Sequence, residues 1–297
     1  MNEQRIRAGV LDVHYQEHGP DDGTPVVLLH GFPYDIHAFD EVAPLVADAG
    51  ARVIVPYLRG YGPTRFLNAD TPRSGQQASL AADLLALMDA LALERPVLAG
   101  FDWGGRAACI VAALWPERVQ ALVSCGGYNI QDIARAGQPA SPEQEHRYWY
   151  QYYLHGERGR AGLERYRAEF CRLLWQLWSP TWMFSDEIYE ITAEAFDNPD
   201  FVEVVVHSYR HRYGLVAGDP DVASIEDALT EQPMIRVPTI VLDGAVDGIP
   251  AYGSPVGHDR HFTGAYERRL LGDVGHNPPQ EAPEAFADAV LSLLGKD

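Results

Sequence analysis

Short apolar runs that alternate with helical segments constrain the fold of this chain more than any other feature. The runs PVVLLH (Pro25–His30) and VPTIVLDG (Val237–Gly244) are almost free of polar residues, which is typical of strands buried on both faces of a parallel sheet. Between them, Ser79–Leu93 repeats leucine every three or four residues, the spacing of a helix with one apolar face. This alternation predicts a doubly wound, mostly parallel α/β sheet, with Leu11–His18 as a half-exposed edge strand.

The strand pattern stops at about Tyr128 and returns only near Val237. The intervening sequence is rich in aromatic residues and arginine, as in YWYQYYLHGERG and FCRLLWQLWSPTWMF, and has no buried-strand pattern. We therefore predict a helical insertion. It divides the chain into a core domain, residues 1–128 and 234–297, and a helical cap (lid) domain, residues 129–233.

Composition limits the classes of partner. The formal net charge is -19, and so acidic a chain repels nucleic acid and anionic membranes. The sequence contains no apolar stretch of about 18 residues that would span a membrane. The three cysteines lack CxxC spacing, which disfavours a disulfide framework or a zinc site. We expect a cytoplasmic protein, compatible with a homodimer, that uses neither a cofactor nor a metal ion.

The segment GFDWGG (Gly100–Gly105) joins a buried apolar run to a helix of small residues. Glycines two positions before and after Asp102 allow a sharp, strained turn, which exposes the central side chain at the carboxyl end of a strand. Such a turn commonly carries a nucleophile, and here its central residue is an aspartate. We therefore predict that Asp102 is the nucleophile.

Two downstream residues complete a catalytic set in the order nucleophile, acid, base. Asp247 follows the run TIVLD, and His276 lies in DVGHNPP, between the last strand and the last helix. His276 would act as the base, and Asp247 would hold its imidazole in the useful tautomer. Asp243 is the alternative acid because it lies nearer the strand end. The position of HGFP predicts an oxyanion hole made by the backbone N–H groups of Phe32 and Trp103.

The ordered motifs HGFP, RGYG, GFDWGG, GAVDG and GHNPP resemble those of the α/β-hydrolase-fold epoxide hydrolases and their dehalogenase relatives. The resemblance extends from about Gly9 to Leu294. It implies an α/β-hydrolase fold with an inserted helical cap. It also implies two cap tyrosines that donate to the substrate; Tyr150 and Tyr209 match those positions, and the local competitors are Tyr148, Tyr152 and Tyr153.

An aspartate nucleophile restricts the reaction. Attack by Asp102 on an sp³ carbon leaves an ester, which water activated by His276 can hydrolyse, whereas a serine would leave an ether that water does not readily cleave. An epoxide suits this site because its opening ring develops an alkoxide, which needs an O–H donor such as tyrosine. We predict an epoxide hydrolase that converts a small hydrophobic epoxide into a vicinal diol, with a substrate channel lined by Phe101, Pro33 and Trp149.

Two other functions stay open. Haloalkane and haloacid dehalogenases also use an aspartate nucleophile. However, the haloalkane enzymes commonly have asparagine at the position of Phe32, and the haloacid enzymes place two arginines after the nucleophile, of which only Arg106 matches. Halide donors could still come from Trp149, Trp175, Trp178 and Trp182. A non-catalytic ligand-binding protein of the same fold would not need to retain Asp102, Asp247 and His276 together.

Overall fold

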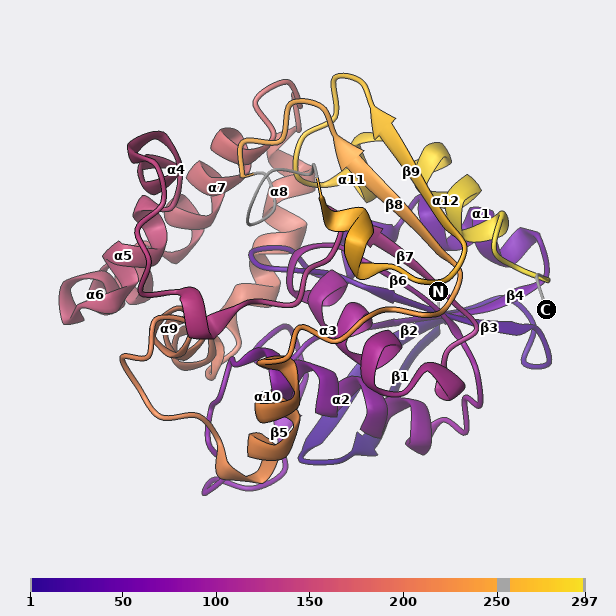
Figure 1. The fold of residues 1–297 in the computed structure, drawn as a ribbon, viewed down its shortest axis with the longest axis horizontal. Coiled ribbons are helices and arrows are strands. Elements are labelled where there is room, and N and C mark those ends of the chain that lie inside the picture. Colours follow the sequence, from indigo (N-terminus) through magenta and orange to yellow (C-terminus); the bar gives the residue numbers. More distant parts are fainter. Residues whose placement is uncertain (1, 250–256, 296–297) are drawn as a thin grey trace.

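One mixed sheet runs through the centre of the computed structural model, which describes residues 2–249 and 257–295 (Figure 1). Nine strands of the described residues form it. Their order is β1 (Asn2–Ala8), β2 (Leu11–His18), β4 (Ala51–Pro56), β3 (Thr24–Leu29), β6 (Val97–Gly100), β7 (Ala121–Cys125), β8 (Thr239–Gly244) and β9 (Tyr266–Leu271), and β5 (Arg65–Phe66) pairs with β2. All neighbours from β4 to β9 run parallel, which confirms the prediction of a mostly parallel sheet.

The prediction that Leu11–His18 forms the edge of the sheet is wrong. β1 pairs antiparallel with β2 along its whole length, and β4 pairs with the other side of β2. The sequence of β1, NEQRIRA, is so polar that it carries no buried-strand signal, and polar side chains are what an exposed edge tolerates. Gly9, at a φ of 57°, makes the tight turn between the two strands.

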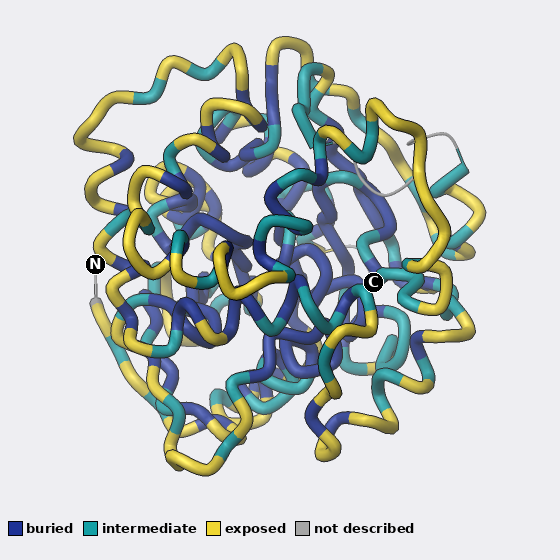
Figure 2. The backbone as a smooth tube through the Cα atoms, turned by 90° about the vertical axis from the view of Figure 1, so that its left-hand side faces the viewer, coloured by how far each residue is buried: buried dark blue, intermediate teal, exposed yellow. Residues whose placement is uncertain are grey.

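The central strands are buried because helices cover both faces of the sheet. In β3, the four residues from Val26 to Leu29 are at most 1% exposed. The helices α1 (Val42–Asp48) and α12 (Pro283–Leu291) pack together on one face, and α2 (Gln77–Ala90) and α3 (Asp102–Leu114) pack together on the other. Figure 2 shows the buried backbone concentrated in the middle of the molecule and the exposed backbone at its margin.

Residues 129–233, all of which are described, form helices and loops without a strand. The helices are α4 (Pro142–Arg147), α5 (Trp149–His155), α6 (Glu157–Arg165), α7 (Arg167–Trp178), α8 (Asp186–Ala193), α9 (Phe201–His211) and α10 (Ala223–Leu229). Most of them lie together on one side of the sheet, on the left in Figure 1. The helix α10 instead packs against α2, where Glu226 accepts from the side chain of Gln77 at 2.8 Å. The division into core and cap domains stays a prediction.

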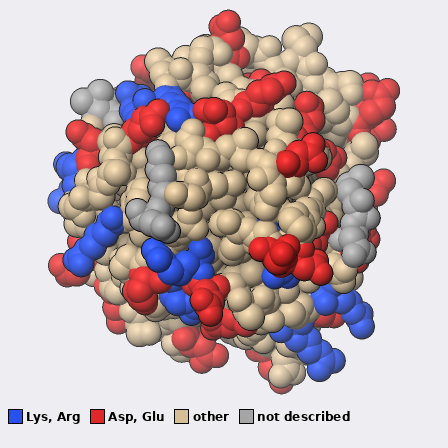
Figure 3. All heavy atoms as spheres, turned by 90° about the vertical axis from the view of Figure 1, so that its right-hand side faces the viewer, with Lys and Arg blue, Asp and Glu red and all other residues tan. Residues whose placement is uncertain are grey.

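The surface agrees with the acidic composition. On the face in Figure 3, acidic side chains are spread over the surface, while basic side chains gather in small groups near its margin. No helix of residues 2–249 and 257–295 is long and apolar enough to cross a membrane.

Candidate active site

The turn between β6 and α3 presents Asp102 as a nucleophile elbow would. Asp102 has a φ of 48°, in the left-handed region that non-glycine residues rarely adopt. The backbone is crowded here: a Cβ on Gly104 would lie 2.2 Å from the carbonyl oxygen of Leu29, and one on Gly31 would lie 2.4 Å from Cβ of Asp102. Glycine at these positions therefore allows the close approach that the turn requires.

The Asp102 carboxylate lies between a backbone donor and a histidine. Its Oδ1 accepts from the N–H of Phe32 at 2.8 Å, and its Oδ2 lies 3.7 Å from Nε2 of His276. Burial alone would raise the pKa of Asp102, but the hydrogen bond and charge of His276, the charge of Arg106 and the N–H of Phe32 together hold the pKa below its usual value. The side chain is therefore an ionised carboxylate. Trp103 follows in the first turn of α3, where backbone N–H groups have no partner within the helix.

Asp247 holds the other side of the His276 ring. Nδ1 of His276 lies 3.0 Å from Oδ2 of Asp247, whose Oδ1 accepts from the N–H of Ile249 at 2.7 Å. Burial would lower the pKa of His276, but the charges of Asp247 and Asp102 raise it to about 10. The alternative acid, Asp243, instead forms an ion pair with Arg268 on β9. The structure thus brings together Asp102, His276 and Asp247, and not Asp243.

A cavity of about 290 Å³ lies against these residues. Its wall includes Asp102, Asp247, His276, Tyr150 and Phe101. The wall also contains polar side chains that the sequence analysis did not place there, namely Arg106, Gln131, Gln151 and Arg212. A second cavity, of about 550 Å³, shares Gln131, Asp132, Tyr148 and Arg212 with the first.

The two predicted cap tyrosines meet although they come from different helices. Tyr150 on α5 and Tyr209 on α9 are both buried, with ring centroids 5.3 Å apart and planes at 87°. The ring of Tyr209 also lies 5.6 Å from that of Phe32. Burial raises the pKa of Tyr209 well above its usual value, so its hydroxyl stays protonated. Of the competitors, Tyr152 bonds to Glu145 and Tyr153 stacks on Phe170, while Tyr148 lines the cavity.

Comparisons with known proteins agree with the observed fold. The family described as alpha/beta hydrolase fold matches residues 24–172. A structure from Klebsiella pneumoniae, provisionally assigned as an epoxide hydrolase, is 51% identical, with a TM-score of 0.96, and the match covers 98% of this chain and 96% of that one. This chain belongs to the α/β-hydrolase family.

Two curated proteins match a shorter part of this α/β hydrolase. YfhM of Bacillus subtilis, an AB hydrolase superfamily protein, is 34% identical over 125 residues, which cover 41% of this chain and 42% of that protein. Epoxide hydrolase B of Mycobacterium tuberculosis is 32% identical over 139 residues, which cover 46% of this chain and 38% of that protein. The chain thus spans about two fifths of the length of these curated relatives.

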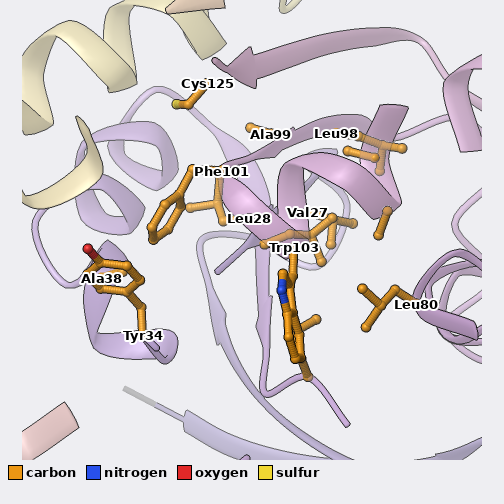
Figure 4. Close-up of a cluster of buried hydrophobic side chains, with 14 of the residues drawn as sticks. Val27, Leu28, Tyr34, Ala38, Leu80, Leu98, Ala99, Phe101, Trp103 and Cys125 are labelled. Atoms are coloured by element: carbon orange, nitrogen blue, oxygen red, sulfur yellow. The ribbon is translucent and has the colours of Figure 1, made fainter. Parts of the chain in front are cut away.

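Only one of the three predicted channel residues of this α/β hydrolase lies on the wall of the 290 Å³ cavity. Phe101 lines it, and Figure 4 shows its ring beside Tyr34, while Trp103 points in a different direction. Pro33 and Trp149, both described, are not part of the cavity wall. The carbonyl oxygen of Pro33 accepts from Nε1 of Trp175 at 2.8 Å, and Trp149 packs its ring on α5 and α7 neighbours.

Sequence reasoning missed the residues that fix the loop carrying His276. Glu281 accepts from the N–H groups of Gly275 and Asn277 at 2.6 and 2.9 Å, and from the hydroxyl of Ser179 at 2.6 Å. That hydroxyl in turn accepts from the N–H of His276 at 3.0 Å. Glu281 follows GHNPP closely in sequence, so its carboxylate, near the start of the last helices, was the one sequence feature that could have indicated this role. Ser179 comes from the inserted helices and had no such feature.

Proposed function

We propose that this α/β hydrolase is an epoxide hydrolase that forms an ester on Asp102 and hydrolyses it with water activated by His276. The observation that carries the proposal is the position of one ionised carboxylate, held between the N–H of Phe32 and the ring of His276, on a cavity that Tyr150 also lines. An ionised carboxylate is the form that attacks carbon. The names of relatives such as Epoxide hydrolase B support the same activity.

In the first step, a carboxylate oxygen of Asp102 forms a bond to an epoxide carbon while the bond from that carbon to the ring oxygen breaks. The ring oxygen takes the proton of Tyr150 or Tyr209, because an alkoxide is too basic to leave unprotonated. The buried, protonated phenol of Tyr209 and the cavity position of Tyr150 suit both to this role. The products are an ester on Asp102 and a tyrosinate, which recovers a proton from His276 directly or through water.

In the second step, the neutral His276 accepts a proton from water, and the water oxygen bonds to the ester carbonyl carbon. The backbone N–H groups of Phe32 and Trp103 would stabilise the resulting oxyanion. Collapse of the intermediate breaks the bond to the alkyl oxygen, which takes the proton of the new carboxyl group and leaves as the diol. Asp102 is again ionised and His276 again protonated. Asp247 orients the imidazole through its bond to Nδ1.

The test is to trap the ester. The variant His276→Gln, incubated with an epoxide, should gain the mass of one epoxide per chain, because ring opening proceeds and hydrolysis does not. The variant Asp102→Asn, with the same epoxide, should gain no mass and show no turnover. An unmodified His276→Gln chain, together with diol formation by Asp102→Asn, would contradict the proposed mechanism. Tight epoxide binding without turnover by the wild-type chain would instead indicate a non-catalytic ligand-binding protein.

One observation favours dehalogenation as a second candidate. Nε1 of Trp103 is buried and has no hydrogen-bond partner among the described residues, so its N–H could bind a halide, although Trp103 is not part of the wall of the 290 Å³ cavity. Against this, Phe32 supplies no second side-chain donor, and Nε1 of Trp175 already donates to Pro33. Halide release from haloalkanes or haloacids that Asp102→Ala abolishes, in the absence of diol formation from epoxides, would select this function.

The substrate and the cellular setting are part of the proposal. We expect a small epoxide that is largely hydrophobic, with polar groups tolerated near Arg106 and Gln151 on the cavity wall. The helices of residues 129–233 would act as its cap. The three cysteines, Cys109, Cys125 and Cys171, are buried and unpaired, which agrees with a reducing, cytoplasmic location. A homodimer stays a prediction, for which sedimentation velocity is the direct measurement.

A further inference from the structure

Arg212 contacts the ring of Tyr209 and is linked through Gln151 to the hydroxyl of Tyr150. It follows the last residue of α9, where a positive charge interacts favourably with the helix dipole, and it is only 5% exposed. Its guanidinium carbon lies 4.8 Å from the centroid of the Tyr209 ring, in a cation–π contact. Arg212 also lines the catalytic cavity. Nothing in the motifs of the sequence marks this residue.

The guanidinium of Arg212 determines which way the amide of Gln151 points. Nη1 of Arg212 donates to Oε1 of Gln151 at 3.3 Å, and the hydroxyl of Tyr213 donates to the same oxygen at 3.1 Å. A guanidinium has donors and no acceptor, so the amide atom that faces it must be the oxygen. The amide oxygen of Gln131, in the orientation that satisfies both groups, also faces Arg212, 2.6 Å from Nε.

Because the oxygen of Gln151 faces Arg212, its amide nitrogen faces Tyr150. Nε2 of Gln151 lies 2.9 Å from the hydroxyl oxygen of Tyr150, and Gln151 is only 1% exposed. An amide nitrogen donates and does not accept, so the Tyr150 oxygen receives this bond. The Tyr150 proton must then point away from Gln151. Tyr150 and Asp102 line the same cavity, so an epoxide oxygen bound there can accept this proton.

We propose that Arg212 and Gln151 are positioning residues that keep the proton of Tyr150 directed at the opening epoxide, an inference that rests on the proposed function. Arg212 orients the amide of Gln151, and that amide bonds to the oxygen of Tyr150. The same guanidinium, over the ring of Tyr209, favours negative charge as it develops on the phenols and the substrate oxygen. Both effects belong to ring opening and not to hydrolysis of the ester.

Two substitutions at Gln151 separate this role from packing. In Gln151→Glu, the nearly isosteric carboxylate presents an acceptor to Tyr150 and draws the proton out of the cavity. In Gln151→Met, the side chain neither donates nor accepts. Since a general acid contributes about 10²–10⁴-fold, we expect ring opening to fall by about 30- to 100-fold in Gln151→Glu and by about 3- to 10-fold in Gln151→Met. A packing role predicts the reverse order, because Glu conserves the shape.

The measurement is single-turnover kinetics with rapid quench and intact mass, which follows the rise and the decay of the ester separately. Decay should stay within about threefold of wild type in both Gln151 variants, because hydrolysis uses His276 and Asp247. Arg212→Met, which frees the amide of Gln151 to rotate, should slow ester formation by about tenfold and leave decay unchanged. Its matched control is Arg210→Met. Arg210 also links α9 to α5, because its Nε donates to the carbonyl oxygen of Leu154. The described bonds of Arg210 involve neither cap tyrosine.

The outcomes distinguish this inference from the proposed function. The positioning role is overturned if ring opening in Gln151→Glu is as fast as or faster than in Gln151→Met. It is also overturned if Arg212→Met slows ester formation and ester decay equally. Neither result contradicts the ester chemistry. An unchanged rate of ring opening in Tyr150→Phe also overturns the positioning role, because no proton of Tyr150 is then used. If no ester forms in His276→Gln, the proposed function itself is contradicted. If Gln151→Glu does not fold, the comparison of Arg212→Met with Arg210→Met decides.

Discussion

The charge on Asp102 should control the protonation of His276. The Oδ2 of Asp102 lies 3.7 Å from Nε2 of His276. Burial would lower the pKa of His276, but the two flanking carboxylates raise it to about 10. Two charges about 4 Å apart interact by about 4 kcal/mol at the effective dielectric constant of a protein site. Since 1.36 kcal/mol corresponds to one pKa unit, removal of the Asp102 charge should lower the pKa of His276 by about 3, to about 7. Asp102→Asn makes this change without a substrate.

The assay is an NMR titration of histidine-labelled protein, in which the His276 signal is assigned by its loss in His276→Gln. We expect a pKa of His276 in Asp102→Asn that is lower than in wild type by between about 2 and 3. Asp243→Asn is the matched control, because it neutralises a buried carboxylate that pairs with Arg268 instead. A His276 pKa in Asp102→Asn within about half a unit of wild type would refute the electrostatic coupling between the two residues.

Three further predictions concern the same site. Because the pKa of His276 is raised from 6.5 to about 10 in the folded chain, its stabilisation is complete below about pH 6.5 and is lost as the pH rises toward 10; urea unfolding should show this loss in wild type and not in His276→Gln. Glu281→Gln weakens the bonds that hold the His276 loop, so the rate of ester hydrolysis should fall by about tenfold in single-turnover experiments while ring opening changes little. Gly31→Ala places a Cβ 2.4 Å from that of Asp102, so kcat should fall by more than about 100-fold and the free energy of unfolding by about 2 kcal/mol or more.

The fold was predictable where burial leaves a local signature. The strands β3 and β8 are buried on both faces, so their sequences are nearly free of polar residues, and the leucines of α2 mark its buried face. The strand β1 has no such signature. Its side chains lie at the exposed edge, and what makes it a strand is pairing with β2, a contact that depends on the turn at Gly9.

The residues of the candidate site also divide into those that the sequence predicted and those that it did not. Asp102, Asp247 and His276 each follow a recognisable strand, and parallel strands bring their carboxyl ends to one edge, so short motifs were enough to predict that they meet. Contacts between helices of the inserted segment were not predictable. The bond between Arg212 and Gln151 joins residues 61 positions apart, and it depends on how α5 packs against α9. Helical spacing indicates which face is apolar, but it does not set which two helices meet.

The charges of the site also explain how the proposed roles of Asp102 and Arg212 fit one mechanism. Before ring opening, the reacting negative charge is on Asp102, where the positively charged His276 faces it at 3.7 Å. The proposed ester formation would move that charge to the substrate oxygen and the cap tyrosines. In the proposed mechanism, Arg212 lies over the ring of Tyr209, close to the developing charge, whereas His276 has lost one of the two carboxylates that raise its pKa. On this proposal, the proton transfer that completes the first step prepares His276 as the base for the second, so ester hydrolysis would follow ring opening without a change in the fold.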